Sequence, residues 1–290
     1  MGLRAKFNLT LLVVFVAGLA ATGVLSYTLL QKHARDEVIR KAGIMMEGAL
    51  AVRNYTVSEI RPLLELQLKR GFLPQSVPSY AATQTFQKLR DSYPEYTYKE
   101  ATLNPTNPRD RASDWEADLV NDFRNNPDTK EIIAQRDTPT GKSLVLARPI
   151  QIKSEACLVC HSTPDQAPQT MIKVYGSANG FGWKLDEIVG AQVVSVPMSL
   201  PISQAMTTFY AFMGSLTGIF VALFIVINLL LGHFVIRPLS RMAKHADQIS
   251  VGHLDLPELP EKGRDQVATL AASFNRMRRS LEKALKMVQE

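Results

Sequence analysis

Two long stretches without charged residues dominate the pattern of apolar and polar positions. Residues 7–30 are 24 residues without a charge, with Lys6 and Lys32 on either side, and a second uncharged run covers residues 206–231. A helix needs about 20 apolar residues to cross a bilayer core of roughly 30 Å. The pattern therefore predicts two membrane-spanning helices. The first run is too long for the apolar part of a signal peptide, about 7–15 residues, which favours an uncleaved anchor.

Basic residues lie at the outer ends of both runs. Arg4 and Lys6 precede the first run, and Arg237 and Arg241 follow the second. The positive-inside bias then predicts that both termini are cytoplasmic and that the segment between the runs lies outside, in the periplasm of a bacterial inner membrane. The predicted organisation is a cytoplasmic N-terminus (1–6), a first span (7–30), a periplasmic domain (31–205), a second span (206–231) and a cytoplasmic C-terminal domain (232–290).

The periplasmic segment mixes helical and strand patterns, which predicts an α+β domain. Apolar residues recur in a 4-3-4-3 spacing from Val38 to Val52, so we expect a helix that continues the first span to about residue 55. Residues 112–123 have the spacing of a short amphipathic helix. Four stretches are rich in β-branched and aromatic residues and are expected to be strands of a small antiparallel sheet. These are residues 96–102, 143–152, 170–175 and 188–196.

The C-terminal segment contains two heptad series. Val235, Leu239 and Met242 begin the first, and Val267, Leu270 and Phe274 begin the second, with a connector rich in Gly and Pro between them. One chain cannot bury both apolar stripes. We therefore expect an all-α domain that forms a parallel four-helix bundle in a homodimer. A plain dimerisation coiled coil is the alternative, but it does not explain the connector.

The sequence Cys157-Leu158-Val159-Cys160-His161 is the C-x-x-C-H motif of c-type haem attachment, and it holds both cysteines of the chain. Two thiols at this spacing add to the two vinyl groups of one haem, and the adjacent histidine ligates the iron. The motif predicts one haem c, bound covalently through Cys157 and Cys160, with His161 as a metal ligand. A thioredoxin-like pair, half of a zinc site and a plain disulfide are the alternatives, of which the zinc site lacks further ligands. The motif falls in the loop between the second and third predicted strands.

Composition adds little to these motifs. The formal net charge of +6 is accounted for by membrane topology and solubility, and no basic-aromatic patch indicates a nucleic acid partner. No phosphate-binding loop, Ser/His/Asp set or carboxylate cluster is present. The second heptad helix runs to Glu290, which leaves no room for a kinase, cyclase or methyl-accepting domain. The chain is therefore not expected to be an enzyme.

Several ungapped motifs follow one another in the segment between the apolar runs. They are Arg53-Asn54-Tyr55-Thr56, residues 77–82, residues 98–109, Trp115-Glu116, Cys157 to His161 and Gly180-Phe181-Gly182-Trp183. With these motifs the segment resembles the family of periplasmic c-type haem sensor domains with a PAS-like fold. The resemblance covers roughly residues 35–200 and implies a PAS-like sheet that holds one haem.

The C-terminal segment contains Pro238, Gly263-Arg264-Asp265 and residues 274–277. With these it is similar to the HAMP linker family, although that family usually has Asp-Glu where this chain has Asp265-Gln266.

The second axial ligand of the iron is open at this point. His233, His245 and His253 follow the second span, and His33 lies too close to the first span to reach a haem. Met45 and Met46 remain as thioether ligands, although a methionine on an amphipathic helix is usually core filler. An open or water-bound position is the alternative. Two further residues, Arg53 and Tyr55, are candidates to hydrogen-bond a haem propionate or an iron-bound ligand, or to stabilise the junction of helix and sheet.

The order of haem domain, span and HAMP segment predicts a homodimeric membrane-bound sensor. Such a sensor would detect redox state or a diatomic gas (NO, CO or O2) outside the inner membrane and relay it through the HAMP segment to a cytoplasmic partner in trans. A membrane-anchored monohaem c-type cytochrome, acting as an electron carrier toward a redox partner, is the alternative, and a haem-binding accessory subunit is a third. The sequence names neither the stimulus nor the reduction potential nor the output partner.

Overall fold

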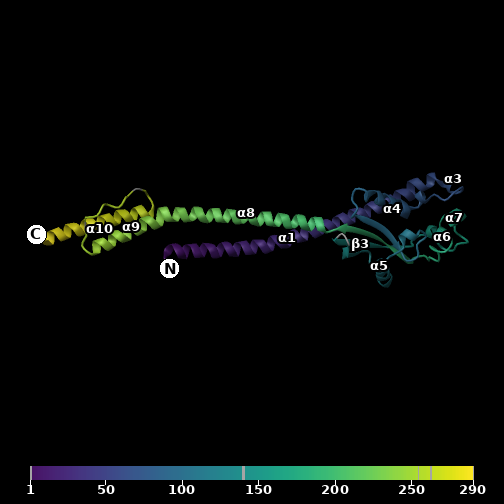
Figure 1. Ribbon diagram of the computed structural model, residues 1–290, viewed down its shortest axis with the longest axis horizontal. Coiled ribbons are helices and arrows are strands. Elements are labelled where there is room, and N and C mark those ends of the chain that lie inside the picture. The colour runs from purple at the N-terminus through teal and green to yellow at the C-terminus, as the bar shows by residue number, and fades with distance from the viewer. Residues whose placement is uncertain (1, 139–140, 254, 262, 290) are drawn as a thin grey trace. The chain divides into compact units, whose positions relative to one another are not determined.

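The structure, a computed structural model, describes residues 2–138, 141–253, 255–261 and 263–289. Residues 27–208 form one compact unit, and residues 1–26 together with 209–290 form another. Figure 1 shows the order of the elements along the chain. The first unit holds all four strands and the C-x-x-C-H motif, and the second holds most of the apolar helices.

The first helix, α1, covers Leu3–Tyr55 without a break. At 1.5 Å per residue its 53 residues extend about 80 Å. Its first half is the predicted apolar run, and its second half carries the 4-3-4-3 stripe, whose members Val38, Ala42 and Ala49 are fully buried. The predicted helix that continues the first apolar run to residue 55 is therefore confirmed.

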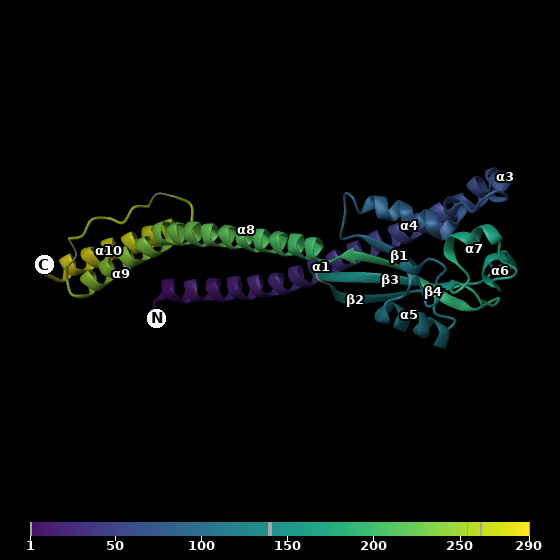
Figure 2. The ribbon, with the colours of Figure 1, turned by 45° about the vertical axis from the view of Figure 1, so that its right-hand side comes forward.

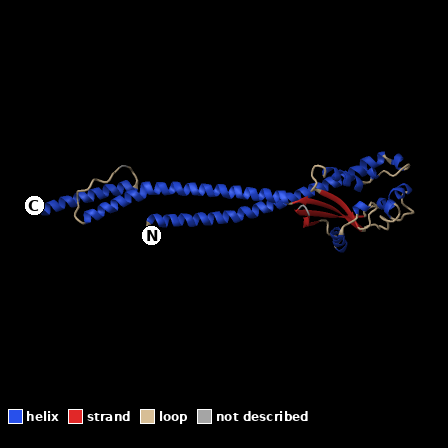
Figure 3. Ribbon diagram, viewed as in Figure 1, coloured by secondary structure: helices blue, strands red, loops and turns tan. Residues whose placement is uncertain are grey.

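Four antiparallel strands form one sheet in the order β1-β4-β3-β2 (Figure 3). The strands are β1 (Thr97–Thr102), β2 (Ile132–Thr138), β3 (Gly141–Gln151) and β4 (Ile188–Pro197). Three of the four predicted strands are confirmed as β1, β3 and β4. Gly190 of β4 lies close to β1, because a Cβ on it would be 2.5 Å from the Ala101 carbonyl oxygen.

The predicted strand at residues 170–175 is wrong, since these residues form the helix α7 (Gln169–Tyr175). Met171 and Tyr175 lie four residues apart, on one side of a helix. Met171 is buried and Tyr175 packs edge-on against Phe72, with ring centroids 5.8 Å apart. The tertiary packing of these two side chains outweighs the strand preference of the β-branched residues in this segment. The edge strand β2 was not predicted, because its polar Gln135, Arg136 and Asp137 hide the alternation of apolar and polar residues.

Helices cover both faces of the sheet (Figure 2). On one face, α1 and α4 (Pro78–Leu89) enclose a core with Leu144 and Val194 of the sheet. On the other face, α5 (Asp114–Asn125) packs Val120 and Phe123 against the sheet. The predicted helix at residues 112–123 is confirmed as α5, which a capping box of Ser113 and Glu116 begins. The expected α+β class holds, as a sheet between helical layers.

Short helices fill the outer part of this unit, beyond the end of α1. A π-helical turn, η1, follows α1 directly, and Pro62 then lies in the short helix α2. These elements are η1 (Thr56–Ile60), α2 (Arg61–Leu63), α3 (Glu65–Leu68), η2 (Pro74–Ser76), η3 (Pro108–Asp110) and α6 (Glu155–His161). The C-x-x-C-H motif is therefore part of the helix α6, and its predicted place in a loop is wrong.

The other unit contains α8 (Ser199–Leu231) from residue 209 onward, a second π-helical turn η4 (Gly232–Ile236), α9 (Arg237–Ser250) and α10 (Gln266–Gln289). The helices that begin with α1 and α8 are both long and apolar enough to cross a membrane. A small core holds Met242 of α9, Ala271 of α10 and Leu259 of the connector, and the heptad residues Leu239, Val267 and Phe274 pack against it. The two predicted heptad helices are thus confirmed as α9 and α10.

Candidate haem-attachment site

Helix α6 presents the two thiols of the motif. Ser154 caps the helix, since its side chain accepts a hydrogen bond of 3.2 Å from the Ala156 N–H. Cys157 and Cys160, three residues apart, project from the same side of the helix. Both side chains are free thiols and partly exposed. A short capped helix therefore holds two thiols at the spacing that two additions to one porphyrin require.

His161 ends α6 with a defined ring orientation. Its Nδ1 lies 2.7 Å from the Gly180 carbonyl oxygen. A carbonyl only accepts, so Nδ1 carries the proton and Nε2 keeps its lone pair. The ring also stacks on Trp183, with centroids 3.9 Å apart and planes 13° from parallel. This is the arrangement of a metal-ligating histidine, in which a partner on one nitrogen orients the other.

The loop at residues 180–183 is built to hold that ring. Gly180 has a φ of +85°, and a Cβ on it would lie 2.8 Å from the backbone N and Cα of Thr106. Only glycine fits there. Asn104 fixes the same loop, because its Oδ1 accepts from the Gly180 N–H at 3.3 Å and its Nδ2 donates to the Phe181 carbonyl at 3.4 Å. The segments around Asn104 and Gly180 thus act as one brace behind His161.

Burial determines the ionisation of this site. Burial lowers the pKa of His161, and the hydrogen bond to Gly180 only partly opposes the effect. The ring is therefore neutral, as a metal ligand must be. Burial also raises the pKa of the Cys160 thiol, although Arg61 opposes this. A thioredoxin-like pair instead depends on a lowered thiol pKa.

Arg53, predicted as a binding residue, lies near the motif and is anchored to the sheet. Its guanidinium donates to the buried carboxylate of Glu100 on β1. Tyr98 donates to the same carboxylate at 2.9 Å, and Gln192 donates to the Tyr98 hydroxyl at 3.0 Å. Burial works against the charge on Arg53, but Glu100, and after it Tyr98 and Cys157, raise its pKa above the ordinary value. Arg53 thus connects the end of α1, the sheet and the electrostatic surroundings of Cys157.

A second ion pair lies in the same row of the sheet. Glu100, Gln192 and Arg148 are direct neighbours across β1, β4 and β3. Arg148 contacts Glu47 of α1 at 2.7 Å and Glu131 at 2.9 Å. We call Glu100, Gln192 and Arg148 the polar row. It fixes α1 to the sheet at two points, through Glu47 and Arg53.

The remaining predicted residues lie elsewhere. Met46 is fully buried and Met45 is 9% exposed, and both belong to the core between α1 and the sheet. Met46 precedes Arg53 by seven residues, about 10 Å along the helix. Tyr55 ends α1 with 57% of its surface exposed. Cys157, Cys160 and His161 lie together on α6, and Arg53 lies within electrostatic range of Cys157, whereas the two methionines are packed into the core.

Three residues that hold the site carried no assigned role in the sequence analysis. Asn104 and Gly180 stand in motifs that served only for the family resemblance, and Glu100 stands in the first of them. Glu100 lies on the same face of β1 as Tyr98 and Thr102, and all three are buried. The sequence therefore places a charged residue at an inward-facing position of a predicted strand. An inward charge on a strand indicates a buried partner, but the pattern does not say that the partner is Arg53.

The fold and the site define a class: an α+β domain with a braced C-x-x-C-H helix, linked by an apolar helix to a pair of heptad helices. The chain belongs to the Tll0287-like family, which it matches over residues 31–197, more than half of its length. It matches the HAMP domain over residues 230–283. The expected family resemblances are therefore confirmed.

Two individual proteins are similar to the chain. Sensor histidine kinase WalK of Bacillus subtilis (strain 168) is 30% identical over 122 residues, which are 42% of this chain and 20% of WalK. The chain thus spans about a fifth of the length of that relative. The crystal structure of the cyanobacterial heme-protein Tll0287 matches with a TM-score of 0.44 and 16% identity, over 56% of this chain and 95% of that one.

We expect Glu100→Gln to lower the free energy of unfolding by about 3 kcal/mol, because it removes the buried carboxylate charge that pairs with the partly buried Arg53 guanidinium. Unfolding of the purified chain is followed by the fluorescence of Trp115 and Trp183, both in the unit of residues 27–208. Glu131→Gln is the matched control, since Glu131 pairs with Arg148 at a more exposed position and should lose less than about 1 kcal/mol. Equal losses in the two variants would contradict a stabilising role for the buried pair.

Proposed function

We propose that this chain is a membrane-bound c-type haem sensor that relays a change at the haem through its HAMP domain to a cytoplasmic partner. The observation that carries the proposal is the orientation of His161. His161 comes directly after the second of two thiols on one short helix. Its Nδ1 is hydrogen-bonded to the Gly180 carbonyl oxygen, which leaves Nε2 free. Membership of the Tll0287-like family, with a HAMP domain in the same chain, supports the transducing role.

The donor set fits a haem better than a bare metal ion. In the part of the chain that the structure describes, no group of three or more His, Cys, Asp and Glu side chains gathers to hold a metal ion. A porphyrin supplies four iron ligands of its own, so one histidine suffices. Each thiol of Cys157 and Cys160 would add across one vinyl group, forming a C–S bond while its hydrogen passes to the other vinyl carbon. Bound haem supplies one-electron chemistry and a place for diatomic gases.

Arg53 and Tyr55 are the proposed polar contacts of the cofactor. Arg53 uses part of its guanidinium on Glu100, and five N–H donors leave others free. A quarter of its side chain is exposed. These features support a propionate contact by Arg53, and Tyr55, two residues later, would act at the exposed side.

Two exits connect the haem domain to the membrane segments. Helix α1 runs without a break from the polar row into the first apolar run, and β4 leads through Met198 into α8. A change of charge at the haem, near Arg53, would therefore act on α1, which is ion-paired with the sheet, and on β4, which is a central strand of the sheet. We propose that the signal is a shift of α1 relative to β4 and α8, and that the HAMP helices of a homodimer pass this shift on through a change between two packing states.

The proposed topology has two spans, both termini in the cytoplasm and the haem domain in the periplasm of the inner membrane. The two long apolar helices and the basic residues at their outer ends support it. The output partner would act in trans, and the chain itself would not be an enzyme. The similarity to one fifth of a sensor histidine kinase supports a partner of the signalling type.

Replacement of both cysteines tests the cofactor. Made together with the haem maturation machinery, the parent chain should carry the mass of one haem and show Soret absorption. Cys157→Ala/Cys160→Ala should show the mass of the bare polypeptide, because neither thioether forms. His161→Ala should keep the added mass and change the spectrum, whereas His33→Ala, in a helix beside the first span, should change neither. A double cysteine variant that still carries covalent haem would overturn the proposal.

The core position of Met46 leads to a proposal on the second axial ligand. The Met46 side chain is fully buried among apolar neighbours. We therefore propose that the second axial position of the iron is left to water or a small ligand. Met46→Ala should then cost about 2–5 kcal/mol of unfolding free energy and leave the ferrous spectrum unchanged. Ile44→Ala, on the exposed side of the same helix, is the control and should cost far less. A spectral change in Met46→Ala or Met45→Ala would establish a thioether ligand instead.

Cysteine cross-linking tests the relay. Met277→Cys and Leu281→Cys, on the partly exposed apolar stripe of α10, should form disulfides between two chains to different extents in the ferric and the ferrous protein. A coupling of ordinary size changes the ratio of two states by about fivefold or more. Lys283→Cys, about 200° around the helix from Leu281, should not cross-link. Identical cross-linking in both states, together with fast electron exchange, would favour the electron carrier.

A further inference from the structure

The HAMP domain contains a pocket directly after the second apolar helix. Its volume is about 300 Å³, and it lies between the start of α9, the connector and the start of α10. Apolar side chains, among them Met242 and Ala271, form its floor. His233, Arg237 and Arg241 line one side of it. Each of these three follows the last by four residues, so they form one line along the helix.

The two arginines differ from those of α10 in their pairing. Among the residues that the structure describes, neither Arg237 nor Arg241 takes part in an ion pair, whereas Arg278 and Arg279 of α10 both pair with Glu258. Asp265 also lines the pocket, but its Oδ1 accepts from the Ala268 N–H at 2.8 Å and caps α10. Its charge is therefore compensated by the N-terminus of that helix. The pocket is left with an excess of positive charge.

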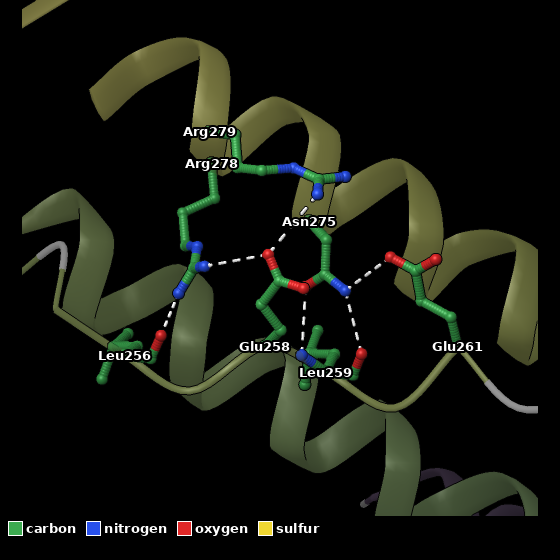
Figure 4. Close-up of polar contacts among 7 residues, drawn as sticks. All are labelled: Leu256, Glu258, Leu259, Glu261, Asn275, Arg278 and Arg279. Atoms are coloured by element: carbon green, nitrogen blue, oxygen red, sulfur yellow. Dashed lines mark hydrogen bonds and ion pairs between the residues drawn. The ribbon is translucent and has the colours of Figure 1, made fainter. Parts of the chain in front are cut away.

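The opposite wall of the pocket is fixed in place. Leu259 and Pro260 of the connector form it, and Asn275 binds both backbone groups of Leu259, accepting from its N–H at 3.1 Å and donating to its carbonyl at 2.9 Å (Figure 4). The Asn275 amide also donates to Glu261 at 2.9 Å, and Arg278 donates to the Leu256 carbonyl. Asn275 is 1% exposed. The wall is thus part of the folded domain.

The place of the pocket in the chain indicates what it binds. Phe234, 57% exposed, stands beside His233 at the end of the apolar helix, where a span leaves the hydrocarbon region. A π-helical turn, a feature frequent at functional sites, covers these residues. Basic pockets at the cytoplasmic ends of spans bind anionic headgroups. We propose that Arg237 and Arg241 bind the phosphate of an anionic phospholipid, with Phe234 against its glycerol and acyl carbons.

The test uses the full-length, haem-loaded protein in mixed micelles and native mass spectrometry. Stepwise dissociation constants are measured for dioleoyl phosphatidylglycerol and for the neutral dioleoyl phosphatidylcholine. We expect the first phosphatidylglycerol to bind the parent chain more tightly than phosphatidylcholine does. Arg237→Gln/Arg241→Gln should weaken that first step by about 30-fold, since each basic side chain near an anionic surface contributes about fivefold.

The control variant Lys244→Gln/Arg276→Gln removes the same charge from α9 and α10 outside the pocket. It should keep the affinity for the first phosphatidylglycerol, and an equal loss would overturn the proposal in favour of diffuse attraction. Displacement of the lipid by excess inorganic phosphate would overturn it in favour of free phosphate. A changed dimer fraction with unchanged lipid retention would show that a second copy of the chain fills the pocket. Unaltered Soret absorption of both variants verifies that the protein is intact.

Discussion

The hydrogen bond between the His161 ring and the Gly180 carbonyl is the constraint on which the candidate site depends. It fixes the proton on one nitrogen and leaves the other available, and the Trp183 ring fixes the plane. The bond exists because a glycine with positive φ lets the chain pass against Thr106. The chemistry of the motif thus rests on a loop about twenty residues away and on the segment of Asn104, more than fifty residues before it.

The polar row divides the domain into two parts with different roles. On one side of it, the apolar core of α1, α4 and the sheet supplies stability. On the other side lie the end of α1, α6 and the histidine loop. The Arg53–Glu100 pair is costly to separate because its carboxylate is buried, so α1 is held against the sheet where the site begins.

Much of this fold could be predicted from local periodicity. The apolar runs, the stripe of α1 and the heptads of α9 and α10 follow from spacing alone, and the thiols and His161 follow from one motif. The failures are tertiary. Residues 170–175 carry strand composition but pack as a helix around Met171, and β2 is hidden by its polar residues. The pairing of Arg53 with Glu100, and of His161 with Gly180, joins segments that no local pattern relates.

The π-helical turn η4 between α8 and α9 sets the rotational phase of everything after it. A π turn accommodates one more residue than an α turn, and one residue corresponds to about 100° around a helix. The faces of α9 are therefore rotated relative to those of α8 by an amount that residues 232–236 determine. Loss or gain of this single extra residue is the smallest backbone rearrangement that would turn α9 about its axis, with no change in the length of the apolar helix.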